Sequence, residues 1–143
     1  MPIGKAPPPH NSAMAVASSA LKTNQARMRV IAENIANANS TAQVPGGDPY
    51  RRRVPVLEPD GKVAPGADGV KIAAIRDNMR AFRTVYDPGH PAADAQGYVK
   101  MPNVDSLIES LDMREAQRAY EANLNVIETA RSMDSRTLEI LRK

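Results

Sequence analysis

Asp87, His90 and Asp94 are the first residues in this chain that could carry chemistry. Imidazole and carboxylate groups at this spacing are ordinary ligands for divalent metals. The intervening chain contains two prolines and a glycine, which predict a rigid turn, and no second histidine lies nearby. We therefore expect a turn here rather than a metal site, and we expect the protein to use no cofactor.

A second candidate is the basic run Arg51-Arg52-Arg53, which could contact phosphate. On an extended strand Arg51 and Arg53 point to one face and Arg52 to the other, so the run does not form a single patch. No aromatic residues are interleaved with it. We expect a solvated edge or a contact with an acidic neighbour, and no nucleic-acid partner.

Catalytic groups have little support elsewhere in the chain. There is no cysteine, so a thiolate nucleophile and a disulfide framework are excluded. The two histidines are isolated in proline-rich segments, and no glycine-rich phosphate loop occurs. Glu115 and Glu121 fall on a predicted helix, where a solvated face explains them. The sequence predicts that the protein is not an enzyme.

Hydrogen-bonding chemistry is concentrated in Asn34, Asn37 and Asn39. Asparagine is a mediocre helix former, so three in six residues need an explanation. One explanation is a fraying helix end with local capping. The other is hydrogen bonding across subunits, because buried side-chain amides can fix the register of packed helices. Asn123 could act in the same way.

The elements that position these residues follow from the helix breakers. All twelve prolines and eight glycines lie outside two windows, His10–Val44 and Asn103–Lys143. Proline costs about 3 kcal/mol and glycine about 1 kcal/mol in a helix interior. We expect a mainly α fold with a small β insert, divided into a disordered segment (1–10), helices at 11–44 and 104–143 forming one discontinuous helical domain, and a β-rich insert with an extended loop (45–103).

Both helical windows carry apolar residues at alternating spacings of three and four, typical of a coiled-coil seam. The seams are Met14, Ala17, Leu21, Asn24, Met28, Ile31, Ile35 and Ala38, then Met113, Ala116, Tyr120, Asn123, Ile127, Ala130 and Asp134. Further apolar residues make the second helix apolar on more than one side, so a hairpin of the two helices leaves apolar surface for other subunits. The residues expected to pack are Leu21, Met28, Ile31, Ile35, Tyr120, Leu124, Ile127, Met133, Leu138 and Leu141.

The insert has three short segments rich in β-branched residues, which predict strands at Tyr50–Leu57, Val70–Ile75 and Phe82–Tyr86. Pro55 cannot donate to a ladder and favours an edge strand. Proline and glycine in 87–103 predict an extended loop that returns to the second helix.

Composition and charge limit the function classes further. The chain has 143 residues, which suits one domain, and five aromatic residues. No apolar run of roughly 18 residues predicts membrane insertion, and the N-terminus lacks the apolar core of a cleaved signal. Residues 1–53 hold seven basic and two acidic groups, whereas 104–143 hold six basic and eight acidic groups. Opposite charges at the two ends favour pairing of the helices.

Four segments carry a family resemblance: NIANANST (34–41), PGGDPYRR (45–52), DPGHPAADAQGYVKMPNV (87–104) and DMREAQRAYEANLNV (112–126). In this order, followed by ARSMDSRTLEIL, they closely resemble the FlgC family of flagellar basal-body rod proteins, within the wider rod and hook axial family. The resemblance runs from about residue 20 to the C-terminus. Two departures are the proline-rich start and Glu109, where methionine is common; we expect that change to alter packing only.

The resemblance implies a structural subunit of the proximal rod in the periplasm. It implies export in an unfolded state through the flagellar type III apparatus, without a cleaved signal, and assembly through the terminal helices into a helical axial tube that transmits torque. The implied partners are copies of the same chain, neighbouring proximal rod proteins and the adaptor that joins the rod to the export gate and MS ring. Two alternatives stay open: a sibling rod protein, and a non-flagellar helical interaction module.

Overall fold

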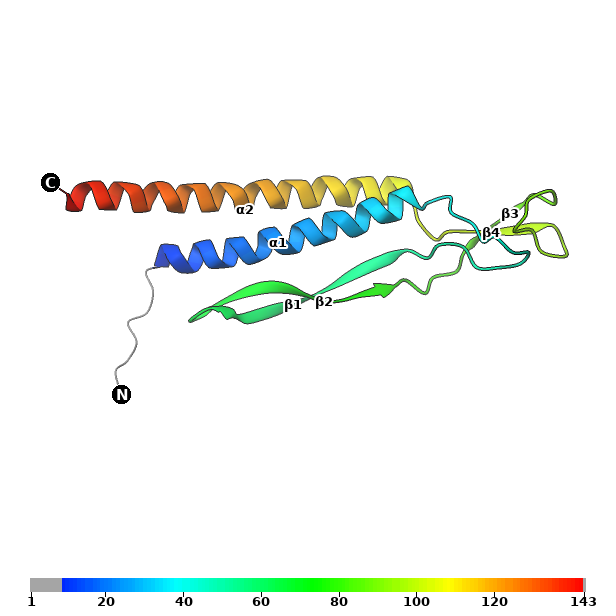
Figure 1. Cartoon of the computed structure of the whole chain (residues 1–143), viewed down its shortest axis with the longest axis horizontal. Coiled ribbons are helices and arrows are strands. Elements are labelled where there is room, and N and C mark those ends of the chain that lie inside the picture. The colour runs from blue at the N-terminus through cyan, green and yellow to red at the C-terminus, as the bar shows by residue number, and fades with distance from the viewer. Residues whose placement is uncertain (1–8, 143) are drawn as a thin grey trace. The chain divides into compact units, whose positions relative to one another are not determined.

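A computed structural model of the chain describes residues 9–142 (Figure 1). Most of the predicted disordered segment, residues 1–8, lies outside the described residues, as does residue 143. The predicted fold class is confirmed, because two long helices enclose a few short strands. The elements in chain order are α1 (Pro9–Ala36), β1 (Arg53–Ala64), β2 (Ala67–Asp77), β3 (Arg83–Tyr86), β4 (Tyr98–Met101) and α2 (Ser106–Leu141).

The described residues form two compact units, and α1, α2, β1 and β2 each contribute to both. Of the described residues, the first unit contains 9–27, 57–73 and 115–142; the second is Met28–Val56 with Ala74–Arg114.

The ends of α1 differ from the expected bounds of 11 and 44. The helix begins at Pro9, since proline is tolerated in a first helical turn, where its missing N–H is not needed. It ends at Ala36 because Asn37 caps it: both the backbone N and the side-chain Nδ2 of Asn37 donate to the carbonyl of Glu33, at 3.0 and 2.9 Å. The Ser40 hydroxyl then donates to Asn37 Oδ1 at 3.0 Å. Asn37 therefore acts as a local cap at this helix end.

Helix α2 begins at Ser106, two residues later than expected, because Asp105 is its N-cap. Asp105 Oδ1 accepts from the backbone N of Leu107 at 3.0 Å and of Ile108 at 3.4 Å. A carboxylate at this position satisfies free N–H groups and also interacts favourably with the helix dipole.

In the first unit the early part of α1 lies antiparallel to the late part of α2. Arg27 of α1 forms an ion pair with Glu115 of α2 at 3.7 Å, whereas Val16, eleven residues earlier, lines a cavity together with Asn123 and Val126, further along α2. The predicted seam of α2 is the face that this pairing covers: of its seven residues none is exposed, and Ala116 and Ala130 are buried.

Strands β1 and β2 form a hairpin that turns at Pro65 and Gly66, where Gly66 has a φ of +71°. Both strands are longer than predicted, and β1 continues through Asp60-Gly61 to Ala64. In the first unit the hairpin packs closely on α1. A Cβ added to the buried Gly69 would lie 2.5 Å from both Ser19 Oγ and Val63 Cγ2.

The predicted extended loop 87–103 contains β4, which pairs antiparallel with β3 in the second unit. Tyr86 lies opposite Tyr98, and their rings meet edge to face with centroids 5.3 Å apart. Behind this pair Val99 forms a small core with Ala92 and Ala93. Strand β4 was not predicted from the sequence, because its four residues follow a proline- and glycine-rich turn.

Candidate functional site

Asn34 is the centre of a buried polar network in the second unit, with a side chain that is 1% exposed. Its Nδ2 donates to the carbonyl of Arg53 at 2.8 Å and to Glu109 Oε2 at 3.4 Å. Its Oδ1 accepts from the backbone N of Arg53 at 3.0 Å and from the hydroxyl of Tyr50 at 2.7 Å. An amide can make four hydrogen bonds. All four are made within this chain.

Glu109 contributes the negative charge of the network and is also 1% exposed. The Nε of Arg52 donates to Glu109 Oε1. A second nitrogen of Arg52 lies 3.5 Å from Asp112, one turn further along α2. Asn103 accepts from the backbone N of Arg52 at 2.8 Å and so holds the arginine in place. A buried carboxylate is tolerable only with such a partner.

Burial raises the pKa of the Tyr50 phenol, and the nearby Glu33 carboxylate raises it further. The hydroxyl is thereby held in the protonated form that donates to Asn34. The network ties the end of α1, the start of β1 and the start of α2 within the second unit. The role of the network is to stabilise the fold, because its polar groups hydrogen-bond to one another.

The other arginines of the basic run also have partners within the second unit. Arg51 donates to the carbonyls of Asn78 and Arg80, each at 3.1 Å, and its guanidinium lies 4.0 Å from the centre of the Phe82 ring. Arg53 forms an ion pair with Glu33 at 3.5 Å. All three arginines therefore serve contacts within the chain.

His90 and its neighbours are part of a turn. His90 Nδ1 accepts from the backbone N of Ala92 at 3.0 Å, and Asp94 Oδ1 accepts from the backbone N of Gln96 and of Tyr98, each at 2.9 Å. Within residues 9–142, no cluster of three or more His, Cys, Asp or Glu side chains could hold a metal ion.

The remaining candidate asparagines lie nearer the surface. Asn37 is half-buried at the end of α1, and Asn39 is exposed. Asn39 lines a cavity of about 450 Å³ in the second unit together with Arg80 and Ser106. Asn123 is half-buried in the first unit, beside Val16.

The ten predicted packing residues fall into two sets. Ile31 is buried, and Leu21, Met28, Tyr120 and Ile127 are half-buried, so these residues serve contacts within the chain. The exposed set contains Ile35, Leu124, Met133, Leu138 and Leu141. From Leu124 onward the exposed fraction of the exposed apolar side chains of α2 rises, from 37% at Leu124 to 75% at Leu141. No helix among residues 9–142 is long and apolar enough to cross a membrane.

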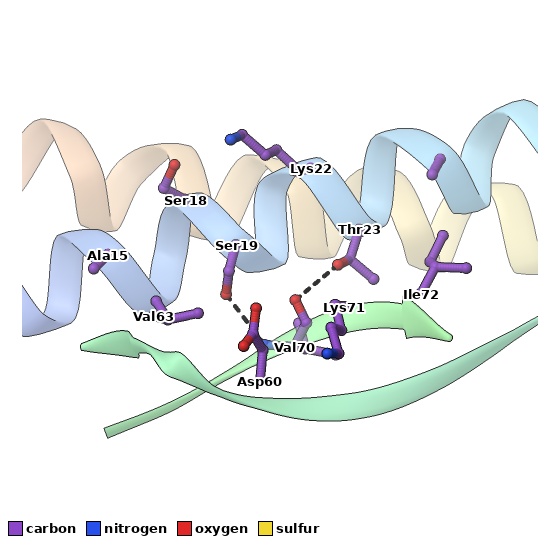
Figure 2. A pocket seen from close by; sticks show the side chains of 11 residues that line it. Ala15, Ser18, Ser19, Lys22, Thr23, Asp60, Val63, Val70, Lys71 and Ile72 are labelled. Atoms are coloured by element: carbon purple, nitrogen blue, oxygen red, sulfur yellow. Dashed lines mark hydrogen bonds between the residues drawn. The ribbon is translucent and has the colours of Figure 1, made fainter. Parts of the chain in front are cut away.

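A groove of about 510 Å³ lies between α1 and the β1–β2 hairpin in the first unit (Figure 2). Two hydrogen bonds cross its floor, from the backbone N of Val70 to Ser19 Oγ at 3.2 Å and from Thr23 Oγ1 to the Val70 carbonyl at 3.1 Å. Small side chains such as Ala15 and Ala26 line the helix side. Lys22, Asp60 and Lys71 are the ionisable residues of its lining.

Sequence reasoning missed the role of Glu109, which was expected to alter packing only. The available signal was its spacing: Glu109 lies four residues before Met113 and so continues the apolar seam of α2 backwards. A carboxylate on such a seam needs a buried cation. The basic run contained one, Arg52.

The comparisons with known proteins match both helices. The family model described as flagella basal body rod protein covers residues 14–42, and the model described as flagellar basal body rod FlgEFG protein C-terminal covers residues 95–140. The flagellar basal-body rod protein FlgC of Agrobacterium fabrum is 44% identical over 134 residues, which are 94% of this chain and 96% of that protein. The chain belongs to the FlgC family. FlgC of Salmonella typhimurium is 42% identical over 87% of this chain and 92% of its own length, and FlgC of Bacillus subtilis is 36% identical over 87% and 93%.

This family membership bears on the exposed apolar residues of α2, because a subunit of an assembly can have apolar surface that is exposed in the isolated chain. FlgC relatives are named as components of the flagellar basal-body rod. The wider model that covers residues 95–140 spans β4 and nearly all of α2, including Leu138 and Ile140 but not Leu141. The part of α2 that carries Leu124, Met133 and Leu138 therefore lies within the segment that this family model matches.

Proposed function

We propose that the chain is a structural subunit of the proximal rod of the bacterial flagellar basal body and assembles into a helical axial tube that transmits torque across the periplasm. Membership of the FlgC family supports the rod assignment. The observation that carries the assembly mode is the exposed end of α2, where Leu138, Ile140 and Leu141 are 63%, 72% and 75% exposed. Burying such a side chain stabilises an interface by about 1.5–3 kcal/mol.

The proposed partners are other copies of this chain, neighbouring rod proteins and the adaptor that joins the rod to the export gate and MS ring. We propose that these interfaces use the ten packing residues and the asparagines Asn37, Asn39 and Asn123. The exposed members would contact neighbouring subunits directly, and the buried members would hold the two helices in the arrangement that presents them. Asn34 acts indirectly, since its amide is fully used within the chain. We further propose export in an unfolded state through the flagellar type III apparatus, without a cleaved signal, and no enzymatic activity.

The test is cryo-electron tomography of basal bodies in a strain that lacks this gene. The rod above the inner-membrane ring should be lost, restored by the full chain and not restored by a chain truncated after Glu128. A chain that lacks only Arg142 and Lys143 is the matched control and should restore the rod.

Normal rods in the deletion strain would contradict the proposal. A helical interaction module would then take its place, and a discrete dimer that binds a ligand tightly would support that alternative.

A further inference from the structure

We infer that successive copies of this chain contact each other through two complementary sets of three residues, a basic set on α1 and an acidic set on α2. The basic set is Lys22, Gln25 and Arg29; the acidic set is Glu121, Leu124 and Glu128. This inference rests on the proposed function and specifies which helix faces meet.

Both sets have the same geometry. In each set the second residue comes three positions after the first, and the third comes four positions after the second. The set therefore lies on one helix face and spans two turns, about 10.5 Å. Helices that pack side by side interdigitate such rows at an interaxial distance of about 8–10 Å. Charges at both ends of one set can therefore meet charges at both ends of the other.

The charges match in either direction. Because Lys22 and Arg29 are both positive and Glu121 and Glu128 are both negative, parallel and antiparallel helices each give two opposite-charge pairs. Between them, the exposed side chain of Leu124 meets the stem of Gln25. Two basic sets, or two acidic sets, would instead repel each other. Flanking charges of this kind set partner choice between packed helices.

All six residues are available for such a contact. Each is exposed and lies outside the buried seams of α1 and α2. Among residues 9–142, the side chains of the four charged members form no ion pair or hydrogen bond with another residue. Other charged residues of both helices, such as Arg27 and Glu115, are already paired with each other.

The contact is heterologous, because the two surfaces differ and lie on the same chain. A copy that offers its acidic set still has a free basic set, so a third copy can join. Such contacts generate open helical assemblies when they do not close into a ring. One exposed ion pair contributes little to the free energy of association, but a growing assembly repeats the contact at every subunit.

Charge reversal tests the pairing in a strain that lacks the native gene. The variants K22E/R29E and E121K/E128K should each lower the fraction of cells with complete rods by about tenfold, since attraction becomes repulsion. The quadruple variant, with both sets reversed, should restore rods to within about twofold of the parent chain. Normal rods with either double variant, or no rescue by the quadruple variant, would overturn the inference.

Cysteine crosslinking provides an independent readout, because the chain contains no cysteine. Cells that produce two differently tagged copies, one with Gln25→Cys and the other with Leu124→Cys, should give a covalent heterodimer after mild oxidation of isolated basal bodies. Ala122→Cys in place of Leu124→Cys is the control, since Ala122 is exposed and lies two residues from Leu124, on nearly the opposite side of α2. Equal crosslinking in the control, or none with Leu124→Cys, would overturn the inference.

The two proposals fail in different ways. Normal rods in the deletion strain would remove the proposed function itself. Loss of rods on deletion, together with normal rods from both double variants, would leave the structural role intact and reject only this pairing of faces.

Discussion

Arg52 and Glu109 form the most deeply buried ion pair that the structure describes in the second unit. The Glu109 side chain is 1% exposed and that of Arg52 is 24% exposed. Removing the cation leaves a buried charge without its partner, whereas removing the charge of the carboxylate leaves an arginine with access to water and to Asp112. The two halves of the pair should therefore respond differently to substitution.

We predict that Arg52→Ala lowers the free energy of unfolding by about 3 kcal/mol and Glu109→Gln by about 1 kcal/mol. Arg53→Ala is the matched control, because its ion pair with Glu33 is nearly half exposed; it should cost at most about 1 kcal/mol. Urea denaturation of the purified chain followed by circular dichroism measures all three. Equal effects of Arg52→Ala and Arg53→Ala would contradict the buried-pair account.

Tyr50 predicts a dependence of stability on pH. Its pKa is raised in the folded state, chiefly by burial, so the folded chain holds the phenolic proton more tightly than the unfolded chain does. The stabilisation is fully present below the unfolded pKa of about 10 and is lost as pH rises through the folded pKa. Tyr50→Phe should lower the unfolding free energy by about 1 kcal/mol at neutral pH.

The same variant should also flatten the alkaline decline in stability. Urea denaturation at several values between about pH 9 and pH 11 compares the two chains. An equally steep decline in wild type and Tyr50→Phe would show that another group controls it.

Individual roles were only partly predictable from residue type. Asn37 was predictable as a local cap, because asparagine near a helix end bonds to nearby backbone groups. Asn34 was not, because its partners Tyr50, Arg53 and Glu109 are 16, 19 and 75 positions away. A single sequence shows that a polar residue needs a partner and does not show which one the fold supplies.

At the scale of elements, Gly69 controls how the hairpin packs on α1. A methyl group there would lie 2.5 Å from Ser19 Oγ, and Ser19 is held by hydrogen bonds to Val16 and Val70. We predict that Gly69→Ala lowers the free energy of unfolding by about 1–3 kcal/mol and exposes the hairpin to proteases. Thermal unfolding and limited proteolysis measure the two effects.

Gly61→Ala is the control for this prediction. Gly61 lies in the same hairpin, and its added Cβ would meet only the Asp68 carboxylate, at 3.4 Å. That variant should unfold and resist proteolysis as the parent chain does. If Gly69→Ala behaves like Gly61→Ala, the hairpin does not depend on close approach to Ser19.

Helices were easier to predict than strands for a physical reason. The breakers that flank α1 and α2 are local signals, and the three-four seam of α2 coincides with the face that its chain buries. Strand β4 depends on its pairing with β3, and the extension of β1 to Ala64 depends on its pairing with β2. Such pairings depend on partners that local composition does not specify.

At the scale of the whole molecule, the chain buries one stripe of each helix and leaves others uncovered. The buried residues of α2 lie on its predicted seam and on Glu109, whereas from residue 131 to 142 only Asp134 is not exposed. These last turns of α2 bury little apolar surface within the chain and so contribute little to its folding stability. Their exposed leucines and isoleucine are explained if neighbouring subunits cover them.

If the buried residues stabilise the fold and the exposed end of α2 serves assembly, substitutions at that end should affect assembly alone. The double variant Leu138→Asp/Leu141→Asp should leave the helix content and unfolding transition of the purified chain unchanged, because both side chains are largely exposed. In cells it should prevent rod assembly, since two carboxylates would have to be buried without partners. Ser132→Asp/Ser135→Asp is the control, because it adds the same two negative charges at the same three-residue spacing, at exposed positions of α2 that are not apolar. A double leucine variant that builds normal rods would show that the end of α2 stays in water after assembly, and the interface would then have to be built from other faces.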